Sequence, residues 1–177
     1  IFVNPAAAKT PRSWSAKRFE DLVEALRLRE PDRRIIVHNR SPFEMPPNWV
    51  SSQDVLAVGD ATLPELCAVL ERCSLYIGND SGPAHLAALF RVPTITLFGP
   101  STPLRTGPTP KPGVSAIDLT AAFPCSPCRE RFYKECPSPP SPEGCPPCLE
   151  AISIGQVIDK AEHVLSGDGS FSFDLEA

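Results

Sequence analysis

The stretch from Tyr76 to Phe90, YIGNDSGPAHLAALF, places polar and turn-forming residues between two apolar runs. The first run predicts a buried strand and the second predicts a short buried helix. Ser81 can cap this helix with its hydroxyl, and Pro83 suits an early helical position. The free N–H groups and partial positive charge of a helix start attract phosphate. Gly82 lets a ligand approach the backbone closely, and His85 follows within the first turn of the helix. The plainer interpretation is a structural strand-to-helix turn with a structural histidine.

Two further turns share this chemistry and argue for a bound nucleotide diphosphate. The segment LFGPSTP, which contains Gly99, follows the next predicted strand, and AAAKTPRSW follows the first one. The latter carries the cations Lys9 and Arg12 and the hydroxyl of Thr10. In an open parallel sheet, ligands bind outside the carboxyl ends of the strands, so the three turns are expected to form one crevice. The chain lacks the GxGxxG and GxxxxGK[ST] patterns, which argues against NAD and against ATP as a phosphoryl donor.

Alternating strands and helices are predicted to position these turns. The strand patterns are IFVN, RIIVH, DVLAVG, LYIG, TITLF and VSAID. Helix patterns between them start at Ser15, which could cap the first helix, and at Thr62, which has Glu65 at capping-box spacing. The strands are continuous apolar runs, as a parallel sheet covered on both faces requires. The predicted fold class is therefore α/β, a Rossmann-like, doubly wound parallel sheet of about six strands.

Composition and charge narrow the class of protein. The chain has 177 residues, of which 42% are hydrophobic and 21% are charged, as expected for a globular domain with a real core. A net charge of −4 without a basic stripe argues against nucleic-acid binding. No apolar run approaches the roughly 18 residues of a membrane span. Because the chain opens directly on a strand pattern, we expect it to be a fragment of a longer protein.

Proline and cysteine concentrate in one late segment. Thirteen of the 22 prolines lie between Pro100 and Pro147, and five of the seven cysteines lie there too. We therefore expect an α/β domain over residues 1–165, with a Pro/Cys-rich insertion at about 123–149 that ends before a final helix, Ile154–Leu165. Residues 166–177 lack periodicity and are expected to form a flexible tail.

The cysteines of this insertion have metal-ligand spacing. Cys125-x2-Cys128 and Cys145-x2-Cys148 match a structural zinc site with four thiolates, and Cys136 is an alternative ligand. The insertion has no strand or helix pattern, so the cysteine pairs are the only evident means of fastening it. Two alternatives stay open: reduced thiols in a proline-braced loop, or disulfides formed during purification.

The segment GNDSGPAHLAALFRVPTITLFGPSTP resembles the signature of glycosyltransferase family 9, the ADP-heptose:lipopolysaccharide heptosyltransferases. NPAAAKTPRSWSAKRFEDL resembles the first turn and helix of that family's nucleotide-binding domain. The resemblance extends from residue 1 to about residue 165 and covers only the C-terminal half of a family member. It implies one half of a GT-B enzyme, whose two Rossmann-like domains face a cleft. The N-terminal acceptor domain, which supplies the catalytic carboxylate, is then absent from this chain.

The resemblance also implies roles for single residues. Asp80 would hold sugar or ribose hydroxyls, and the backbone amides of Ser81 and Gly82 would bind the diphosphate. Arg12 stands where the family has a Lys or Arg against the phosphates, and such a cation stabilises the leaving diphosphate. The donor-binding residues so implied are Arg12, Asp80, Ser81, Gly82, His85, Thr10 and Gly99. The general base is expected in the missing domain, so that this fragment alone should be inactive.

The function implied is transfer of a sugar from an ADP-sugar, ADP-heptose first, to a lipopolysaccharide-core or related glycan acceptor. Catalysis would need no cofactor, and the enzyme would be cytoplasmic or lie at the cytoplasmic face of the inner membrane. Two departures from the family pattern leave the nucleotide base and the sugar undetermined. Three alanines, Ala6–Ala8, fill the first turn, and Glu44 is only a weak candidate for binding the ribose. The alternatives are a transferase using another nucleotide sugar, a non-catalytic nucleotide-sugar-binding module, and an interaction module organised by the cysteines.

Overall fold

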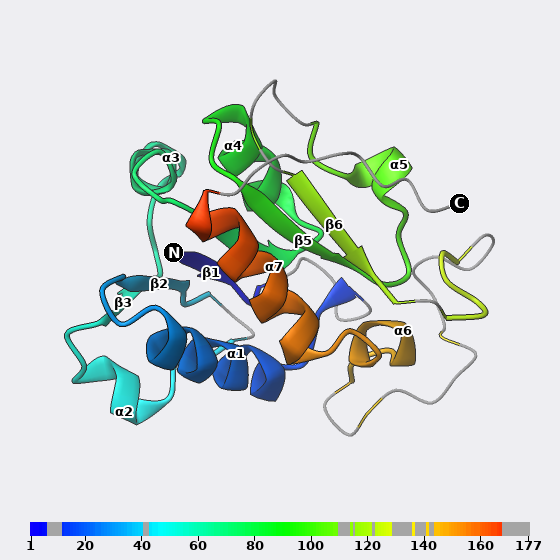
Figure 1. Ribbon diagram of the computed structural model, residues 1–177, viewed down its shortest axis with the longest axis horizontal. Helices are drawn as coiled ribbons and strands as arrows, with labels where there is room; N and C mark the ends of the chain where they lie inside the picture. The colour runs from blue at the N-terminus through cyan, green and yellow to red at the C-terminus, as the bar shows by residue number, and fades with distance from the viewer. Residues whose placement is uncertain are drawn as a thin grey trace.

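The computed structural model describes residues 1–6, 12–40, 43–109, 114, 116–121, 123–128, 136, 141 and 144–167. Strands and helices alternate along these residues, as the apolar runs predict (Figure 1). The strands are β1 (Phe2–Asn4), β2 (Ile35–His38), β3 (Val55–Val58), β4 (Tyr76–Asn79), β5 (Thr94–Phe98) and β6 (Ala116–Thr120). The helices are α1 (Ala16–Arg29), α2 (Pro47–Val50), α3 (Leu63–Leu70), α4 (Gly82–Leu89), α5 (Pro103–Thr106), α6 (Pro147–Glu150) and α7 (Ile154–Ser166). Most of the predicted tail lies outside the described residues.

The six strands form one parallel sheet in the order β3-β2-β1-β4-β5-β6, which confirms the predicted fold class. The strand order reverses between β1 and β4, and such a switch point is where open α/β sheets bind ligands. The register pairs Asn4 of β1 with Gly78 of β4, and Gly78 with Thr96 of β5. The carboxyl ends of β1, β4 and β5 are therefore neighbours, as the three-turn prediction requires.

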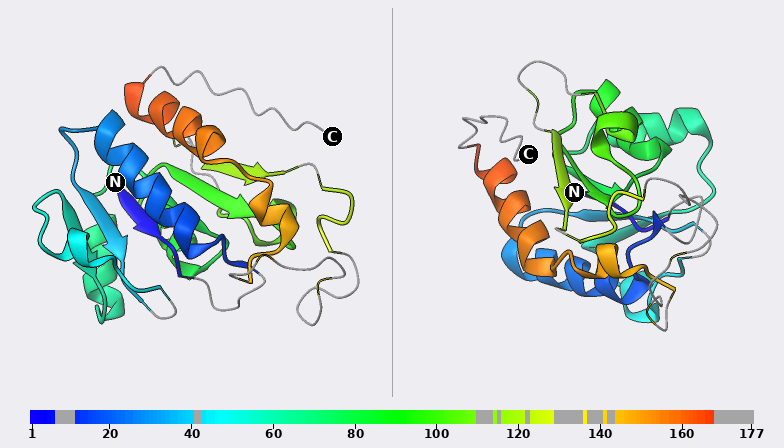
Figure 2. Two further views of the ribbon diagram at one scale, coloured as in Figure 1. Left: turned by 90° about the horizontal axis from the view of Figure 1, so that it is seen from below. Right: turned by 90° about the vertical axis from the view of Figure 1, so that its right-hand side faces the viewer.

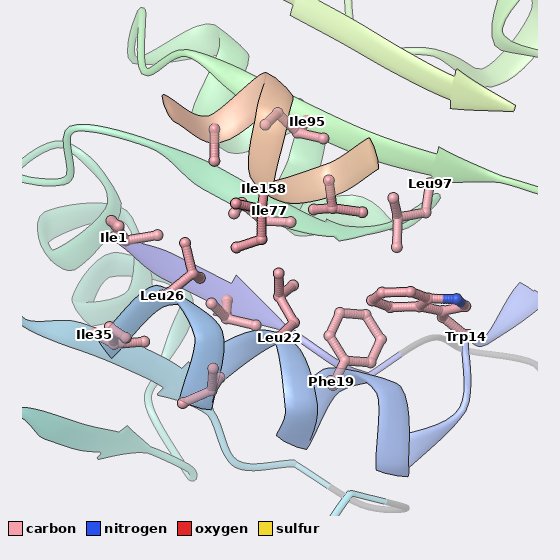
Figure 3. Packing of buried hydrophobic residues seen from close by; sticks show 14 of the residues in the cluster. Ile1, Trp14, Phe19, Leu22, Leu26, Ile35, Ile77, Ile95, Leu97 and Ile158 are labelled. Atoms are coloured by element: carbon pink, nitrogen blue, oxygen red, sulfur yellow. The ribbon is translucent and has the colours of Figure 1, made fainter. Parts of the chain in front are cut away.

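Helices cover both faces of the sheet. Helices α1 and α7 lie side by side on one face, and α3 and α4 lie on the other (Figure 2). Successive side chains of β1 point to opposite faces of the sheet. Phe2 packs with residues of α3 and α4, and Val3 packs with residues of α1 and α7. Figure 3 shows Leu22 and Ile77 within the larger of these two cores. In the part of the chain that the structure describes, no helix is long and apolar enough to cross a membrane.

The predicted helix starts are largely confirmed. Ser15 is the N-cap of α1, and its hydroxyl accepts a hydrogen bond from the Arg18 N–H at 3.3 Å. At the start of α3, the Glu65 carboxylate accepts from the Thr62 N–H at 2.8 Å, as the capping-box spacing predicts. Because these caps satisfy backbone groups at the helix ends, they fix where each helix leaves its preceding turn.

Both ends of the Pro/Cys-rich insertion dock on the turn after β5. The Ser126 hydroxyl donates to the Gly99 carbonyl at 2.5 Å, and the Cys128 N–H donates to the Pro100 carbonyl at 3.0 Å. From the other end, Leu149 of α6 is fully buried, and a Cβ on Gly99 would lie 2.5 Å from its Cγ. Hydrogen bonds to backbone carbonyls and apolar packing therefore fasten the described ends of this segment, where only the cysteine pairs were expected to do so.

Candidate functional site

The site is built around Asp80, directly after β4. Its side chain is only 5% exposed and accepts two hydrogen bonds, from Nη1 of Arg12 at 3.3 Å and from the Thr106 hydroxyl at 3.1 Å. Arg12 precedes α1, and Thr106 ends α5, so three segments distant in the sequence meet at one carboxylate. The guanidinium side chain is 22% exposed and therefore still borders solvent. The carboxyl edge of the sheet thus brings Arg12 and Asp80 together as an ion pair.

Ser81 is the N-cap residue of α4, as predicted, but its hydroxyl makes no cap hydrogen bond. The prediction that this hydroxyl caps the helix is wrong because Nδ2 of Asn4 donates to Ser81 Oγ at 2.9 Å instead. The start of α4 therefore has no side-chain cap among the described residues, and its N–H dipoles are suited to an anionic ligand. Gly82 is exposed, and a Cβ there would meet no described atom within 4 Å. His85, also exposed, lies in the same turn of helix.

A buried polar network supports this turn from behind. His38 Nδ1 donates to the Asn4 side-chain oxygen at 2.8 Å, and Asn4 Nδ2 donates to the hydroxyl of Tyr76 at 3.0 Å as well as to Ser81. Burial lowers the pKa of His38 and raises the pKa of Tyr76 to about 12. At neutral pH both groups are therefore uncharged, so a neutral chain of hydrogen bonds fixes the Ser81 hydroxyl without placing charge beneath the site.

Asn79, the last residue of β4, ties down the loop that follows β1. Its Nδ2 donates to the Pro5 carbonyl at 2.8 Å, and its Oδ1 accepts from the Trp14 N–H at 2.9 Å. The side chain is fully buried. Asn4 and Asn79 were both missed in the sequence analysis. The signal was there, since the strands IFVN and YIGN each end in an asparagine.

Asp118 adds a second carboxyl to this side of the sheet. It lies on β6, in register with Thr96 of β5. Burial, and after it the charge of Asp80, raises the pKa of Asp118 to about 6. Asp118 is nonetheless an exposed residue. Asp118 therefore titrates close to neutrality within electrostatic range of Asp80.

The remaining predicted residues are placed less directly. Thr10 and Lys9 lie outside the described residues. Gly99 faces Leu149 and Cys148, so the packing of α6 explains why it has no side chain, and a contact with a ligand stays a prediction. Glu44, weakly predicted for the ribose, is exposed in the segment between β2 and α2.

The cysteines of the insertion have the spacing of metal ligands but not the arrangement. Among the residues that the structure describes, no group of three or more Cys, His, Asp or Glu side chains is arranged to hold a metal ion. The pKa of Cys148 is raised to about 11, chiefly by burial and then by the neighbouring thiols, Cys128 more than Cys136 and Cys125. Burial also raises the pKa of Cys145. Among the described residues, the predicted four-thiolate arrangement is therefore not assembled.

Together, the parallel sheet with its switch point and the helices on both faces define the class, a Rossmann-like α/β domain. The family model for glycosyltransferase family 9 (heptosyltransferase) matches residues 1–137, which is most of the chain. The chain therefore belongs to glycosyltransferase family 9, as its signature segment predicts. It is 33% identical over 104 residues to lipooligosaccharide heptosyltransferase 2 of Campylobacter jejuni, a match covering 59% of this chain and 30% of that protein.

Solved structures show the same fold. ADP-heptose lipopolysaccharide heptosyltransferase II of E. coli matches with a TM-score of 0.71 at 17% identity, over 94% of this chain and 46% of that one. The iron-containing dodecameric heptosyltransferase TibC, in complex with ADP-D-beta-D-heptose, matches with a TM-score of 0.70 at 15% identity, over 95% of this chain and 45% of that one. The chain thus spans less than half the length of the relatives that it matches.

Proposed function

We propose that this chain is the donor-binding domain of a heptosyltransferase-type glycosyltransferase, and that it binds an ADP-sugar, ADP-heptose first. The observation that carries the proposal is the meeting of Arg12, Asp80 and the uncapped start of α4 at the switch point of the sheet. The choice of nucleotide and sugar is supported by the structural relatives, which are heptosyltransferases, one of them solved in complex with ADP-D-beta-D-heptose.

Each group has a physical role in this proposal. The N–H groups at Ser81 and Gly82 bind the diphosphate, which the helix dipole attracts. Arg12 neutralises charge on the diphosphate as it leaves, when the glycosidic bond breaks. Asp80, held by two donors, accepts hydrogen bonds from sugar or ribose hydroxyls. His85 borders the same turn.

We further propose a source for the general base and a class of acceptor. The general base that deprotonates the acceptor hydroxyl comes from a second domain facing this one, and the acceptor is a lipopolysaccharide-core or related glycan. We propose the cytoplasmic face of the inner membrane as the place of reaction. A second candidate is a non-catalytic nucleotide-sugar-binding module, which would use the same Arg12–Asp80 pair and the same uncapped start of α4.

Calorimetry tests the nucleotide binding that both candidates require. The chain is titrated with ADP, UDP and GDP, and we expect heat with ADP. If none of the three gives detectable heat at millimolar concentration, both candidates fail. Incubation of the same chain with ADP-heptose and a glycan acceptor should yield no transfer, because the base is expected in a facing domain. Turnover that a point substitution within this chain abolishes would contradict that assignment.

We also keep the cysteine-rich insertion as a metal-site proposal. A structural zinc or iron ion would draw together Cys125, Cys128, Cys145 and Cys148, with Cys136 as an exchange ligand. The support is the C-x-x-C spacing and the iron named in one structural relative. Because the thiols are not arranged for a metal in this structure, binding would have to move them, and no step of sugar transfer depends on it.

A further inference from the structure

Asn4 and Asn79 each end one strand and hydrogen-bond to the turn that follows the other strand. Asn4 ends β1 but its amide reaches Ser81, in the turn that follows β4. Asn79 ends β4 but its amide reaches Pro5 and the Trp14 N–H, at the two ends of the loop that follows β1. Because β1 and β4 are adjacent parallel strands, this exchange ties two separate ligand-facing turns to one another.

The position of Asn79 limits what it can do. Its side chain is fully buried, with one donor on a carbonyl and the acceptor on an N–H, so it presents nothing to a ligand. The loop between its two partners contains Arg12, two residues before Trp14. Arg12 reaches Asp80, the residue directly after Asn79. The amide of Asn79 therefore sets how the cation of one turn meets the carboxylate of the other.

We propose that Asn79 is a positioning residue for the donor diphosphate, because it fixes both ends of the loop that delivers Arg12 to the start of α4. This inference rests on the proposed function. It makes Asn79 act through Arg12, not through the ligand. Loss of the amide should thus weaken binding of the diphosphate while leaving binding of the nucleoside unchanged.

A double-mutant cycle tests this. Asn79→Ser shortens the side chain so that it cannot span both partners, and Asn79→Asp keeps the shape and the acceptor for Trp14 but loses the donor to Pro5. Asn48→Ser, at an exposed position on α2, is the matched control. We expect Asn79→Ser to weaken ADP binding by about tenfold in the parent chain and by less than about twofold in the Arg12→Ala chain, since residues that act as a unit are not additive. Adenosine affinity should not change.

The amide proton resonance of Trp14 gives an independent readout. Asn79→Ser should move it, because the hydrogen bond to Oδ1 is lost, whereas Asn48→Ser should leave it in place. If Asn79→Ser does not fold, Asn79→Asp provides the same cycle. Equal weakening in the parent and Arg12→Ala chains, or unchanged ADP affinity in a chain that binds ADP, would overturn only this inference. A parent chain that does not bind ADP would overturn the proposed function as well.

Discussion

Substitution of Gly82 distinguishes an effect on ligand binding from an effect on the stability of the fold. A Cβ on Gly82 would meet no described atom within 4 Å, and its backbone does not adopt a positive φ. Gly82→Ala should therefore leave the fold at least as stable, by up to about 1 kcal/mol, because alanine loses less conformational entropy on folding. The matched control is Gly78→Ala. There a Cβ would lie 2.9 Å from the Asn4 carbonyl and 2.7 Å from the Tyr76 hydroxyl.

The expected effects on binding and stability run in opposite directions. The space beside Gly82 is where the account seats the diphosphate, so a methyl group there should cost about 1–3 kcal/mol, as overpacking does. This corresponds to about 5- to 150-fold in Kd. Gly78→Ala should instead lower the free energy of unfolding by about 1–3 kcal/mol, because backbone has to move.

Chemical denaturation and calorimetry with ADP measure both quantities on the same samples. If Gly82→Ala binds ADP as tightly as the parent chain, the diphosphate does not lie against the start of α4, and the reasoning fails. A large loss of stability in Gly82→Ala would also refute it, because the site would then be closed by protein.

Three further predictions concern charge, pH and metal. Arg12→Ala should weaken ADP by about 10- to 100-fold by calorimetry and adenosine hardly at all, because its role is with charged oxygens; equal weakening of both would contradict that role. The pKa of Asp118 is raised to about 6 in the folded chain, so its stabilising contribution is present below the ordinary carboxyl pKa and is lost as pH rises through about 6. In Asp118→Asn, the free energy of unfolding should therefore fall less between about pH 4 and pH 7 than it does in the parent chain. An equal fall in both chains would refute the raised pKa of Asp118. Elemental analysis of chain purified under reducing conditions should find zinc or iron near one equivalent, and a chelator should loosen the insertion before it affects ADP binding; less than about a tenth of an equivalent leaves only free thiols.

The fold was largely predictable because its strands are continuous apolar runs separated by turn residues. The sixth strand shows the limit. It was expected at Val114–Asp118, yet β6 spans Ala116–Thr120, with Ile117 and Leu119 facing inward. Only one face of this edge strand is buried, so buried and exposed residues alternate along it. The segment VSAI, taken as a continuous run, therefore placed the predicted strand two residues too early.

The candidate site was predictable where its chemistry is local. Gly82 and Ser81 stand out in their own turn, and Arg12 stands out as a cation near the first strand end. The supporting contacts could not be predicted, because they depend on strand order: Asn4 and Ser81 are 77 residues apart, and they meet only because β1 lies beside β4. For the same reason the hydroxyl of Ser81 was wrongly expected to cap its own helix.

Amide chemical-shift mapping tests the central claim most directly. The chain is labelled with 15N and titrated with ADP, and with adenosine for comparison. We expect ADP to shift the amides of Ser81 and Gly82 and of the residues around Arg12 and Thr106. These lie at the carboxyl edge of β1, β4 and β5, whereas the amides of α2 and β3 should stay unchanged. Shifts confined to α2 and β3, or none at the start of α4 while ADP is bound, would contradict it.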